Sequence, residues 1–541
     1  MQQKSSHPSV ILHNGVVFTA DPKQGWGQAV AVQDNQIMAV GTDEEVLALA
    51  DPKTQVINVQ GRAVLPGFND AHTHYIEAAI REASTFSMFR VADREQAAGV
   101  IRHYAEQNPS NEWLLGKRLD LGRFEGGVFP NRHILDEIEN RRPVAITDID
   151  GHSCWVNTRA LQEMGYTVGT PDPVGGRILR EADGTPNGML LEEAYNPVPA
   201  PVLPAGMDFR QVMRDAGARL NRMGITSLSN NGIELEHLDV LEEMARQGEL
   251  TFRLNEWPAL EENLEYAHSL RERFAGNEQI RVTGLKLFMD GVLSSRTAWL
   301  LEPYSDEAGN CGFPMQPVEE MDALALQADR AGFQVITHAI GDRGVREMLN
   351  IYEHAAQMNG RRDSRHRVEH IEMAHPQDQI RFGSLGVIAS MQPLHATACI
   401  DDYTLARIGA ERGAYSYPWQ SLLNGGAHLC FGTDWPAIDM SRPNPLENIY
   451  GAVTRCHPGI KGMPPFHIEQ GVSLEQAIIS YTTEPAYAEF MEARKGTLTP
   501  GKLADVCVLD RNIFSMPPED LLSVGVSLTM ANGNIVYQQI E

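Results

Sequence analysis

Two histidines separated by one residue follow an apolar, strand-like run near the start of this 541-residue chain. The run covers residues 64–69, and the histidines are His72 and His74. Residues i and i+2 of a β-strand point to the same face, so the two imidazoles converge and can share a metal ion. The spacing alone is a weak signal, because short motifs of this kind recur by chance.

Four further candidates strengthen this signal, since each lies at the end of another apolar run. They are Lys286, His338, His370 and Asp434. Each also has an ordinary structural interpretation. Either histidine can be a hydrogen-bonded core or surface residue, Lys286 can point outward from an alternating strand, and Asp434 can cap the next helix. The structural interpretations become less convincing when the residues are considered together, because five strand ends carry residue types suited to a metal site.

The middle of the chain alternates apolar runs with helical periodicity, which predicts an α/β fold. The candidate strands are residues 64–69, 225–229, 251–256, 281–288, 334–337, 366–371, 386–392 and 429–433. Helix-like stretches lie between them, at residues 235–247, 318–331, 342–358 and 474–481. Eight such strands favour a (β/α)8 TIM-like barrel. A doubly wound open sheet is the alternative, but it would not naturally bring the first and eighth strands together.

The two ends of the chain have a different pattern, typical of β-hairpins. We expect residues 1–62 and 497–541 to build one small β-sandwich domain, and residues 63–496 to form the barrel. Residues 75–223, approximately, interrupt the barrel pattern after its first strand. This stretch is rich in Pro and Gly and shows no simple strand–helix unit. We interpret it as an insertion that shapes the substrate pocket.

The composition of the chain indicates which kinds of partner and which cellular location to expect. The net charge of −26, from 45 basic and 71 acidic residues, argues against nucleic acid and anionic membranes. No apolar run approaches the roughly 20 residues that span a bilayer, and the N-terminus lacks the pattern of a secretory signal. The six cysteines form no Cys-x-x-Cys pair, which indicates reduced thiols. We therefore expect a cytoplasmic protein with a small-molecule substrate; a homodimer remains open.

The six candidates share one chemistry if they meet at the carboxyl ends of barrel strands, where such folds carry their active sites. Imidazole nitrogen and carboxylate oxygen are zinc ligands, although this ligand set also admits manganese, iron or cobalt. Lys286 can join only as a carbamate formed with carbon dioxide, which burial would favour by lowering the lysine pKa. A carbamate can bridge two ions. A bound metal makes hydroxide near neutral pH, and Asp434 could carry its proton.

The remaining histidines give weaker signals. His152 could contact substrate or simply order a loop, and the sequence does not decide between these roles. Five others are expected to be structural or exposed: His375, His395, His428, His457 and His467.

With these motifs in view, the sequence resembles the amidohydrolase superfamily, and within it the YtcJ-like or amidohydrolase-3 group, which includes N-substituted formamide deformylases. The matching segments are residues 65–74, 150–157, 285–291, 338–343, 368–370, 432–436 and 496–505. The resemblance implies the following roles: His72, His74, His338 and His370 as metal ligands, Lys286 as a carbamylated bridge, and Asp434 as catalytic acid/base. The segment 229–231 after the second strand departs from relatives, which often carry His-Asp there.

The expected function is metal-dependent hydrolysis of a non-peptide carbon–nitrogen bond in an amide, an N-substituted formamide or a cyclic amide. The alternative is a heterocycle deaminase. Relatives of that kind usually carry a Glu a few residues after the strand-five histidine, whereas His338 is followed by Ala-Ile-Gly-Asp. A non-catalytic regulatory protein is the third possibility. Loss of ligands would indicate it, and none is lost in this sequence.

Overall fold

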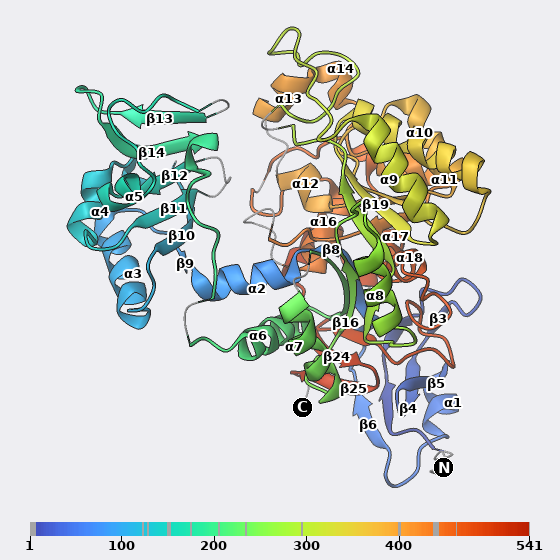
Figure 1. The fold of residues 1–541 in the computed structure, drawn as a ribbon. Helices are drawn as coiled ribbons and strands as arrows, with labels where there is room; N and C mark the ends of the chain where they lie inside the picture. Colours follow the sequence, from blue (N-terminus) through green and yellow to red (C-terminus); the bar gives the residue numbers. More distant parts are fainter. Residues whose placement is uncertain are drawn as a thin grey trace. The chain divides into compact units, whose positions relative to one another are not determined.

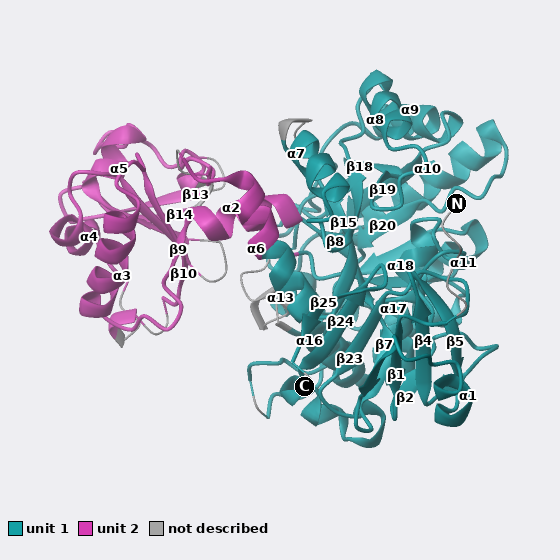
Figure 2. Cartoon of the chain, turned by 90° about the horizontal axis from the view of Figure 1, so that it is seen from below, with its two compact units in different colours: residues 1–74, 216–434, 443–541 teal, residues 75–215, 435–442 magenta. Residues whose placement is uncertain are grey.

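The computed structural model describes residues 7–121, 124–126, 129–148, 153–173, 176–203, 206–232, 235–293, 296–398, 402–436, 443–460 and 462–539 (Figure 1). The chain divides into two compact units (Figure 2). The first unit comprises residues 1–74, 216–434 and 443–541, and the second comprises residues 75–215 and 435–442. His152 and the start of its motif lie outside the described residues.

Nine parallel strands form two sheets in the first unit. The first sheet has the order β17-β16-β15-β8, and the second has the order β18-β19-β20-β21-β22. Their bounds are β8 Phe68–Thr73, β15 Ile225–Asn231, β16 Arg253–Trp257, β17 Ile280–Val282, β18 Gly284–Phe288, β19 Gln334–Ala339, β20 Arg367–His370, β21 Ile388–Met391 and β22 Leu429–Phe431. Only Thr283 separates β17 from β18, and β22 contacts β8. The predicted α/β class is confirmed.

Helices follow most of these strands, as the sequence pattern predicts (Figure 1). The four predicted helices are α7 Leu235–Arg246, α9 Val318–Arg330, α10 Asp342–Asn359 and α17 Leu474–Ser480. The others are α8 Glu265–Arg273, α11 Pro376–Leu385, α12 Pro393–Ala398, α13 Asp402–Ile408, α14 Ala410–Gly413, α15 Trp419–Asn424, α16 Pro445–Thr454 and α18 Thr483–Ala488, with short 3-10 turns at Ile468–Gln470, Ile513–Ser515 and Pro518–Ser523.

The structure corrects the prediction of the first strand in the parallel sheets. The apolar run at residues 64–69 is not one strand, because the chain changes sheet at Gly67. β7 (Ala63–Pro66) pairs with β23 (Val506–Leu509), whereas β8 pairs with β15. The side chain of Thr226 fills the space where a Cβ of residue 67 would lie. Both strands are fully buried, so no polar residue in the sequence marks the break.

Both chain ends contribute to one sheet, with the order β25-β24-β23-β7-β2-β3, beside a second sheet with the order β5-β4-β1-β6. Apolar residues from both ends share one core, which includes Val10, Val30, Val506 and Leu528. The remaining bounds are β1 Val10–His13, β2 Val16–Phe18, β3 Trp26–Gly27, β4 Ala29–Gln33, β5 Gln36–Gly41, α1 Asp43–Leu47, β6 Gln55–Asn58, β24 Val526–Ala531 and β25 Asn534–Gln538.

The second unit has a six-stranded sheet among its described residues, with the order β13-β14-β12-β11-β10-β9. Its bounds are β9 Phe86–Ser87, α3 Arg94–Gln107, β10 Leu114–Leu119, α4 Arg132–Ile138, β11 Val144–Asp148, β12 Ser153–Val156, α5 Thr158–Glu163, β13 Gly176–Arg180 and β14 Pro186–Glu192, with turns at Phe124–Gly126 and Glu193–Tyr195. Helices α2 (Tyr75–Ser84) and α6 (Phe209–Arg222) flank this region in sequence.

This sheet corrects the interpretation that residues 75–223 lack strand–helix units. Strands β9, β10 and β11 are parallel and are connected through α3 and α4. The pattern is hard to see in the sequence because β9 has only two residues. The core of this sheet includes Phe86, Leu114, Ile146 and Trp155.

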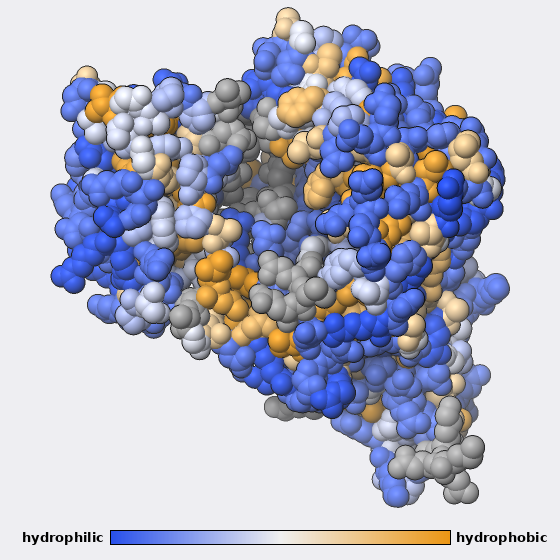
Figure 3. All heavy atoms as spheres, viewed as in Figure 1, coloured by the Kyte–Doolittle hydropathy of each residue, from blue (hydrophilic) through white to orange (hydrophobic). Residues whose placement is uncertain are grey.

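Polar residues dominate the face of the molecule drawn in Figure 3, and apolar residues occupy smaller patches on it. Within the described residues, no helix combines the length and apolar character needed to cross a membrane. The cysteines that the structure describes are all free thiols: Cys154, Cys311, Cys430, Cys456 and Cys507.

Candidate metal centre

Backbone contacts fix Asp434 against the end of β8. The amide of Asp434 donates to the carbonyl oxygen of His72 at 2.7 Å. Asp70 accepts hydrogen bonds from the Thr433 amide at 2.9 Å and from the Thr433 hydroxyl at 2.6 Å. Gly432 is required there, because a Cβ would lie 2.5 Å from the His72 nitrogen. Asp434 itself has a φ of 54°, a strained backbone conformation of the kind that clusters at functional sites.

The predicted His-x-His pair converges on one oxygen of this carboxylate. His72 Nε2 lies 3.4 Å from Asp434 Oδ1, and His74 Nε2 lies 3.3 Å from the same oxygen. Two ligands of a tetrahedral zinc ion lie about 3.3 Å apart when each bond is about 2.0–2.1 Å long. His72 Nε2 and Asp434 Oδ1 are buried and have no hydrogen-bond partner. Buried polar atoms are rarely left unpaired, so the donor set fits a cation.

A second group surrounds the other oxygen of Asp434. His370 Nδ1 lies 3.8 Å from Oδ2, and His395 Nε2 lies 3.5 Å from it. The rings of His370 and His395 are nearly parallel, with centroids 5.7 Å apart. Among the described residues, two sets of three side chains have donor atoms within 4.8 Å of one another. The first set is His72, His74 and Asp434, and the second is His370, His395 and Asp434.

His395, which the sequence predicts to be structural or exposed, is buried and its Nε2 lies 3.5 Å from Asp434 Oδ2. Sequence reasoning missed it because it lies on α12, beyond the end of β21, rather than directly at a strand end. The sequence does contain one indication, which is the short separation along the chain between His395 and the strand before it. His395 follows the predicted strand 386–392 by only three residues, and no candidate had been assigned to that strand.

Lys286 and His338 lie near this cluster but outside both groups. The ring centroids of His338 and His370 are 4.6 Å apart, yet His338 Nε2 lies 3.2 Å from the Gly291 carbonyl oxygen. Lys286 is buried, and its Nζ lies 5.0 Å from the ring centroid of Phe288. Burial lowers the pKa of Lys286 to about 8, although the nearby carboxylates partly oppose this shift.

The buried histidines are held in the neutral form that binds metals. Burial lowers the pKa of His72 to about 4 and of His338 to about 3, and it lowers the pKa of His370 well below the usual value. For Asp434, burial raises the pKa, but the surrounding histidines lower it more, so the carboxyl is ionised. Neutral imidazoles beside a carboxylate are the protonation states that metal binding requires.

A second layer of hydrogen bonds orients the candidate ligands. His72 Nδ1 lies 2.6 Å from Glu369 Oε2, and Arg367 Nε donates to Glu369 Oε1 at 2.8 Å. Gln392 Oε1 lies 2.9 Å from His370 Nδ1. A carboxylate on one ring nitrogen fixes the imidazole so that the other nitrogen faces the metal. Sequence reasoning missed Glu369, although it is the residue directly before His370.

The other histidines with expected structural roles contact residues away from this cluster. His428 Nδ1 bonds Glu484 at 2.7 Å, His457 Nδ1 accepts from the Gly459 amide at 2.8 Å, and the His375 side chain caps α11. His467 Nδ1 lies 3.1 Å from Glu469 Oε1. In the departing segment 229–231, Asn230 is buried and donates to Glu256 Oε2 at 2.9 Å.

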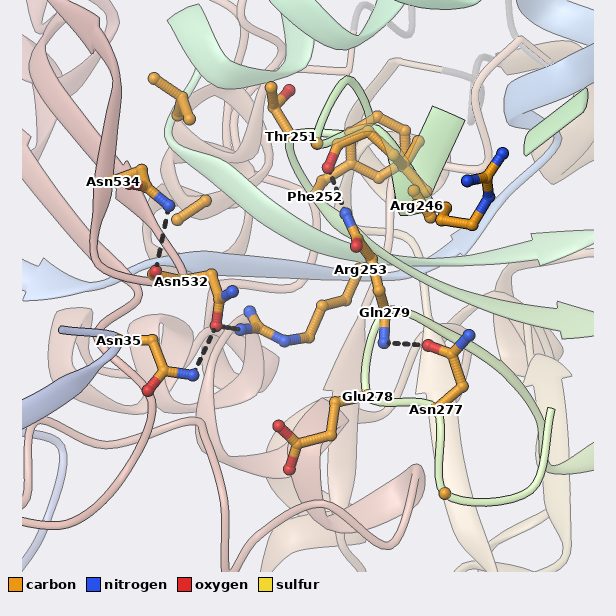
Figure 4. A pocket seen from close by; sticks show the side chains of 16 residues that line it. Asn35, Arg246, Thr251, Phe252, Arg253, Asn277, Glu278, Gln279, Asn532 and Asn534 are labelled. Atoms are coloured by element: carbon orange, nitrogen blue, oxygen red, sulfur yellow. Dashed lines mark hydrogen bonds between the residues drawn. The ribbon is translucent and has the colours of Figure 1, made fainter. Parts of the chain in front are cut away.

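A cavity of about 640 Å³ lies at the opposite, amino ends of β16 and β17, beside the β24–β25 hairpin (Figure 4). Arg253 pairs with Asp505 and donates to Asn532 Oδ1 at 2.9 Å. Asn35 donates to the same oxygen at 3.3 Å. These bonds join the terminal sheets to the parallel strands. They pair the Arg253 side chain, which therefore has a structural role.

A family model described as "Amidohydrolase family" matches residues 55–537 of this chain. The chain belongs to this family. As such it is a hydrolase that acts on carbon–nitrogen bonds other than peptide bonds.

Three curated relatives are similar over nearly the whole chain, and each match covers 98% of it. Protein LONG AFTER FAR-RED 3 of Arabidopsis thaliana is 31% identical, with 91% of that protein covered. Putative amidohydrolase YtcJ of Bacillus subtilis is 28% identical, with 99% covered. N-substituted formamide deformylase of Arthrobacter pascens is 25% identical, with 98% covered. The resemblance to the YtcJ-like group is therefore confirmed.

A solved structure supports the fold. An uncharacterized metal-dependent hydrolase from Pyrococcus furiosus superposes with a TM-score of 0.72 at 24% identity, covering 94% of this chain and 99% of that one.

Proposed function

We propose that this protein is a metal-dependent hydrolase that cleaves an amide, an N-substituted formamide or a cyclic amide. The observation that carries the proposal is the convergence of His72 and His74 on one oxygen of Asp434 at ligand-to-ligand distances; His72 Nε2 and Asp434 Oδ1 are buried, and no described residue hydrogen-bonds them. The relative named N-substituted formamide deformylase supports this substrate class.

The proposed ligands are His72, His74, His338, His370 and Asp434, with zinc as the expected ion and manganese, iron or cobalt as alternatives. A bound divalent ion supplies hydroxide near neutral pH and polarises the substrate carbonyl. Asp434 is ionised and lies within the donor cluster, so it can accept the proton of the attacking water and deliver it to the leaving nitrogen. Glu369 holds His72 in the orientation that this site needs.

Lys286 is proposed to carry a carbamate that bridges two ions. Its amine is buried on β18, and its lowered pKa leaves a reactive neutral fraction near neutral pH. The neutral amine would add to carbon dioxide and release a proton, giving an N-carboxylate with two oxygens. A carbamate would therefore convert Lys286 from a group that repels cations into a ligand beside His338 and His370.

The fold proposed for this chemistry is a closed (β/α)8 barrel with a β-sandwich built from both chain ends. The contact of β22 with β8, and the single residue between β17 and β18, support closure. The shared sheet and core of the two ends support the sandwich. The insertion would then correspond to the second unit, starting at residue 75 and returning at 215. A homodimer and a cytoplasmic location remain predictions.

The residue four positions after His338 bears on the deaminase alternative. Asp342 is buried and accepts hydrogen bonds from the Leu301 amide at 2.8 Å and from the Tyr415 hydroxyl at 3.2 Å. It therefore binds neighbouring loops and does not replace the Glu of that class. The proposed ligands are all present, which argues against a non-catalytic protein.

The test is a substrate panel for the zinc-loaded protein, with N-substituted formamides, linear amides, cyclic amides and amino-substituted heterocycles. We expect amine and carboxylate products from at least one amide class, no ammonia from the heterocycles, and a rate roughly 10²- to 10⁴-fold lower for Asp434→Asn. Ammonia release from heterocycles without amide cleavage would favour the deaminase instead. An absence of turnover across a broad panel, by fully metallated protein, would contradict the proposal.

A further inference from the structure

His395 has the geometry of a metal ligand, although neither its sequence context nor the family resemblance assigns it that role. Its side chain is 10% exposed, and its Nε2 is buried and has no hydrogen-bond partner among the residues that the structure describes. This nitrogen lies 3.5 Å from Asp434 Oδ2. A direct hydrogen bond between an imidazole and a carboxylate is about 2.7–3.2 Å long, so the two groups lie too far apart for one.

The separation fits two ligands of one ion instead. Donor atoms around a tetrahedral ion lie about 3.3 Å apart, and the established pattern of His72 and His74 against Asp434 Oδ1 has this spacing. His395 repeats this spacing on Oδ2, while His370, whose Nδ1 lies 2.9 Å from Gln392 Oε1, would bind through its other ring nitrogen. The two oxygens of Asp434 thus face two separate groups of imidazoles.

The surroundings of His395 hold it in this position. Its other ring nitrogen, Nδ1, lies 3.6 Å from Glu372 Oε1, too far for a direct hydrogen bond, so Glu372 contributes a nearby negative charge on that side. Its backbone amide donates to the Gln392 carbonyl oxygen at 3.0 Å. The start of α12 is fixed by the Leu394 amide, which donates to Asn448 Oδ1 at 3.2 Å.

We propose that His395 is a ligand of the second metal ion, together with His370 and Asp434, and that Asp434 contributes one oxygen to each ion. This inference rests on the proposed metal-dependent function and extends its ligand set. The nitrogen and oxygen donors suit zinc, and cobalt(II) is a suitable spectroscopic substitute. Carbamylated Lys286 and His338 can complete the coordination of the same ion, so the inference is compatible with a bridging carbamate.

The experiment is a titration of the metal-free full-length protein with zinc, in competition with a chelating indicator, followed by elemental analysis of the desalted protein. A parallel titration with cobalt(II) follows the visible absorption of each bound equivalent. His395→Ala and the bulkier His395→Gln are compared with wild type. His354→Ala is the matched control, because His354 is 43% exposed on α10 and pairs with Asp322 away from the site. Circular dichroism verifies folding of each variant.

We expect two tightly bound equivalents in wild type and His354→Ala, and about one in both His395 variants, with one cobalt absorption band lost. If His395→Ala fails to fold, His395→Gln decides. Two tight equivalents in a folded His395 variant, or only one in wild type, would overturn the inference and leave the metal-dependent function intact. Wild type that binds no zinc would instead overturn the proposed function.

Discussion

Two buried clusters of histidine and aspartate lie at opposite ends of the parallel strands, and their contacts differ. At the amino ends, Asp329 accepts from Arg362 Nε at 2.7 Å and from Asn359 Nδ2 at 2.8 Å, and it lies 3.2 Å from His366 Nε2. His366 Nδ1 accepts from the Val335 amide at 2.9 Å. This cluster satisfies its polar atoms by direct hydrogen bonds.

The cluster at the carboxyl ends also combines histidine and aspartate, but its closest separations between an imidazole and the Asp434 carboxylate are 3.3 to 3.5 Å. His72 Nε2, His395 Nε2 and Asp434 Oδ1 have no hydrogen-bond partner. Residue type and burial therefore do not distinguish a structural cluster from a metal site. The features that separate the proposed metal site from the structural cluster are the spacing between donor atoms and the presence of atoms that no described residue hydrogen-bonds.

The largest expected effect follows from His72→Ala. It removes a ligand of the first group, so the protein should lose zinc and its turnover together. The loss should exceed the roughly 100-fold that removal of an outer hydrogen-bond partner can cost. Elemental analysis and the rate on the best amide substrate measure both effects. A variant with full metal content and full activity would place His72 among the structural histidines.

Asp434→Asn should separate catalysis from metal binding. The amide keeps the shape and one oxygen but cannot carry a proton, so the rate should fall by roughly 10²- to 10⁴-fold. The variant should retain more zinc than His72→Ala does. Rates normalised to bound zinc are the measurement. If zinc is lost to the same extent in both variants, Asp434 acts mainly as a ligand.

Glu369→Gln should have a smaller effect, because Glu369 reaches the metal only through His72. We expect zinc affinity to weaken roughly 10- to 100-fold, while activity recovers at saturating zinc. Competition with a chelating indicator measures the dissociation constant. Glu353→Gln is the control, since Glu353 is exposed and pairs with Arg381 away from the site. Unchanged affinity in Glu369→Gln would show that His72 needs no such orientation.

A substitution in the cluster of Asp329 and His366 should change the stability of the protein but not its metal content or activity. Burial raises the pKa of Asp329. Hydrogen bonds from His366 and Asn359 and the charge of Arg362 outweigh this effect and lower the pKa to about 2. The folded pKa lies below the unfolded value of about 3.9, so the stabilisation is present above pH 4 and is lost as the pH falls toward 2.

Asp329→Asn should therefore reduce the free energy of unfolding by roughly 1–3 kcal/mol at neutral pH, and the difference from wild type should shrink toward pH 2. Metal content and turnover should not change. Denaturant unfolding at several pH values measures this, with the more exposed Asp322→Asn as control. Loss of zinc in Asp329→Asn would break the contrast between the two clusters.

Local patterns in the sequence predicted the strand ends well, because strand periodicity and burial depend on neighbouring residues. His72, His74, His370 and Asp434 meet as expected for that reason. The break at Gly67 is hard to see in the sequence, because the strands on both sides of it are buried and the change of sheet depends on contacts with distant strands. His395 was not predicted because its position depends on how the helix after the strand packs. Local sequence patterns do not show this packing.

The most direct test of the metal centre is anomalous diffraction at the zinc absorption edge from crystals of zinc-loaded protein. The structure predicts a strong peak about 2.0–2.2 Å from His72 Nε2, His74 Nε2 and one oxygen of Asp434, with a second peak at His370 on the other side of that carboxylate. Fully zinc-loaded crystals without a peak among His72, His74 and Asp434 would contradict the proposed site.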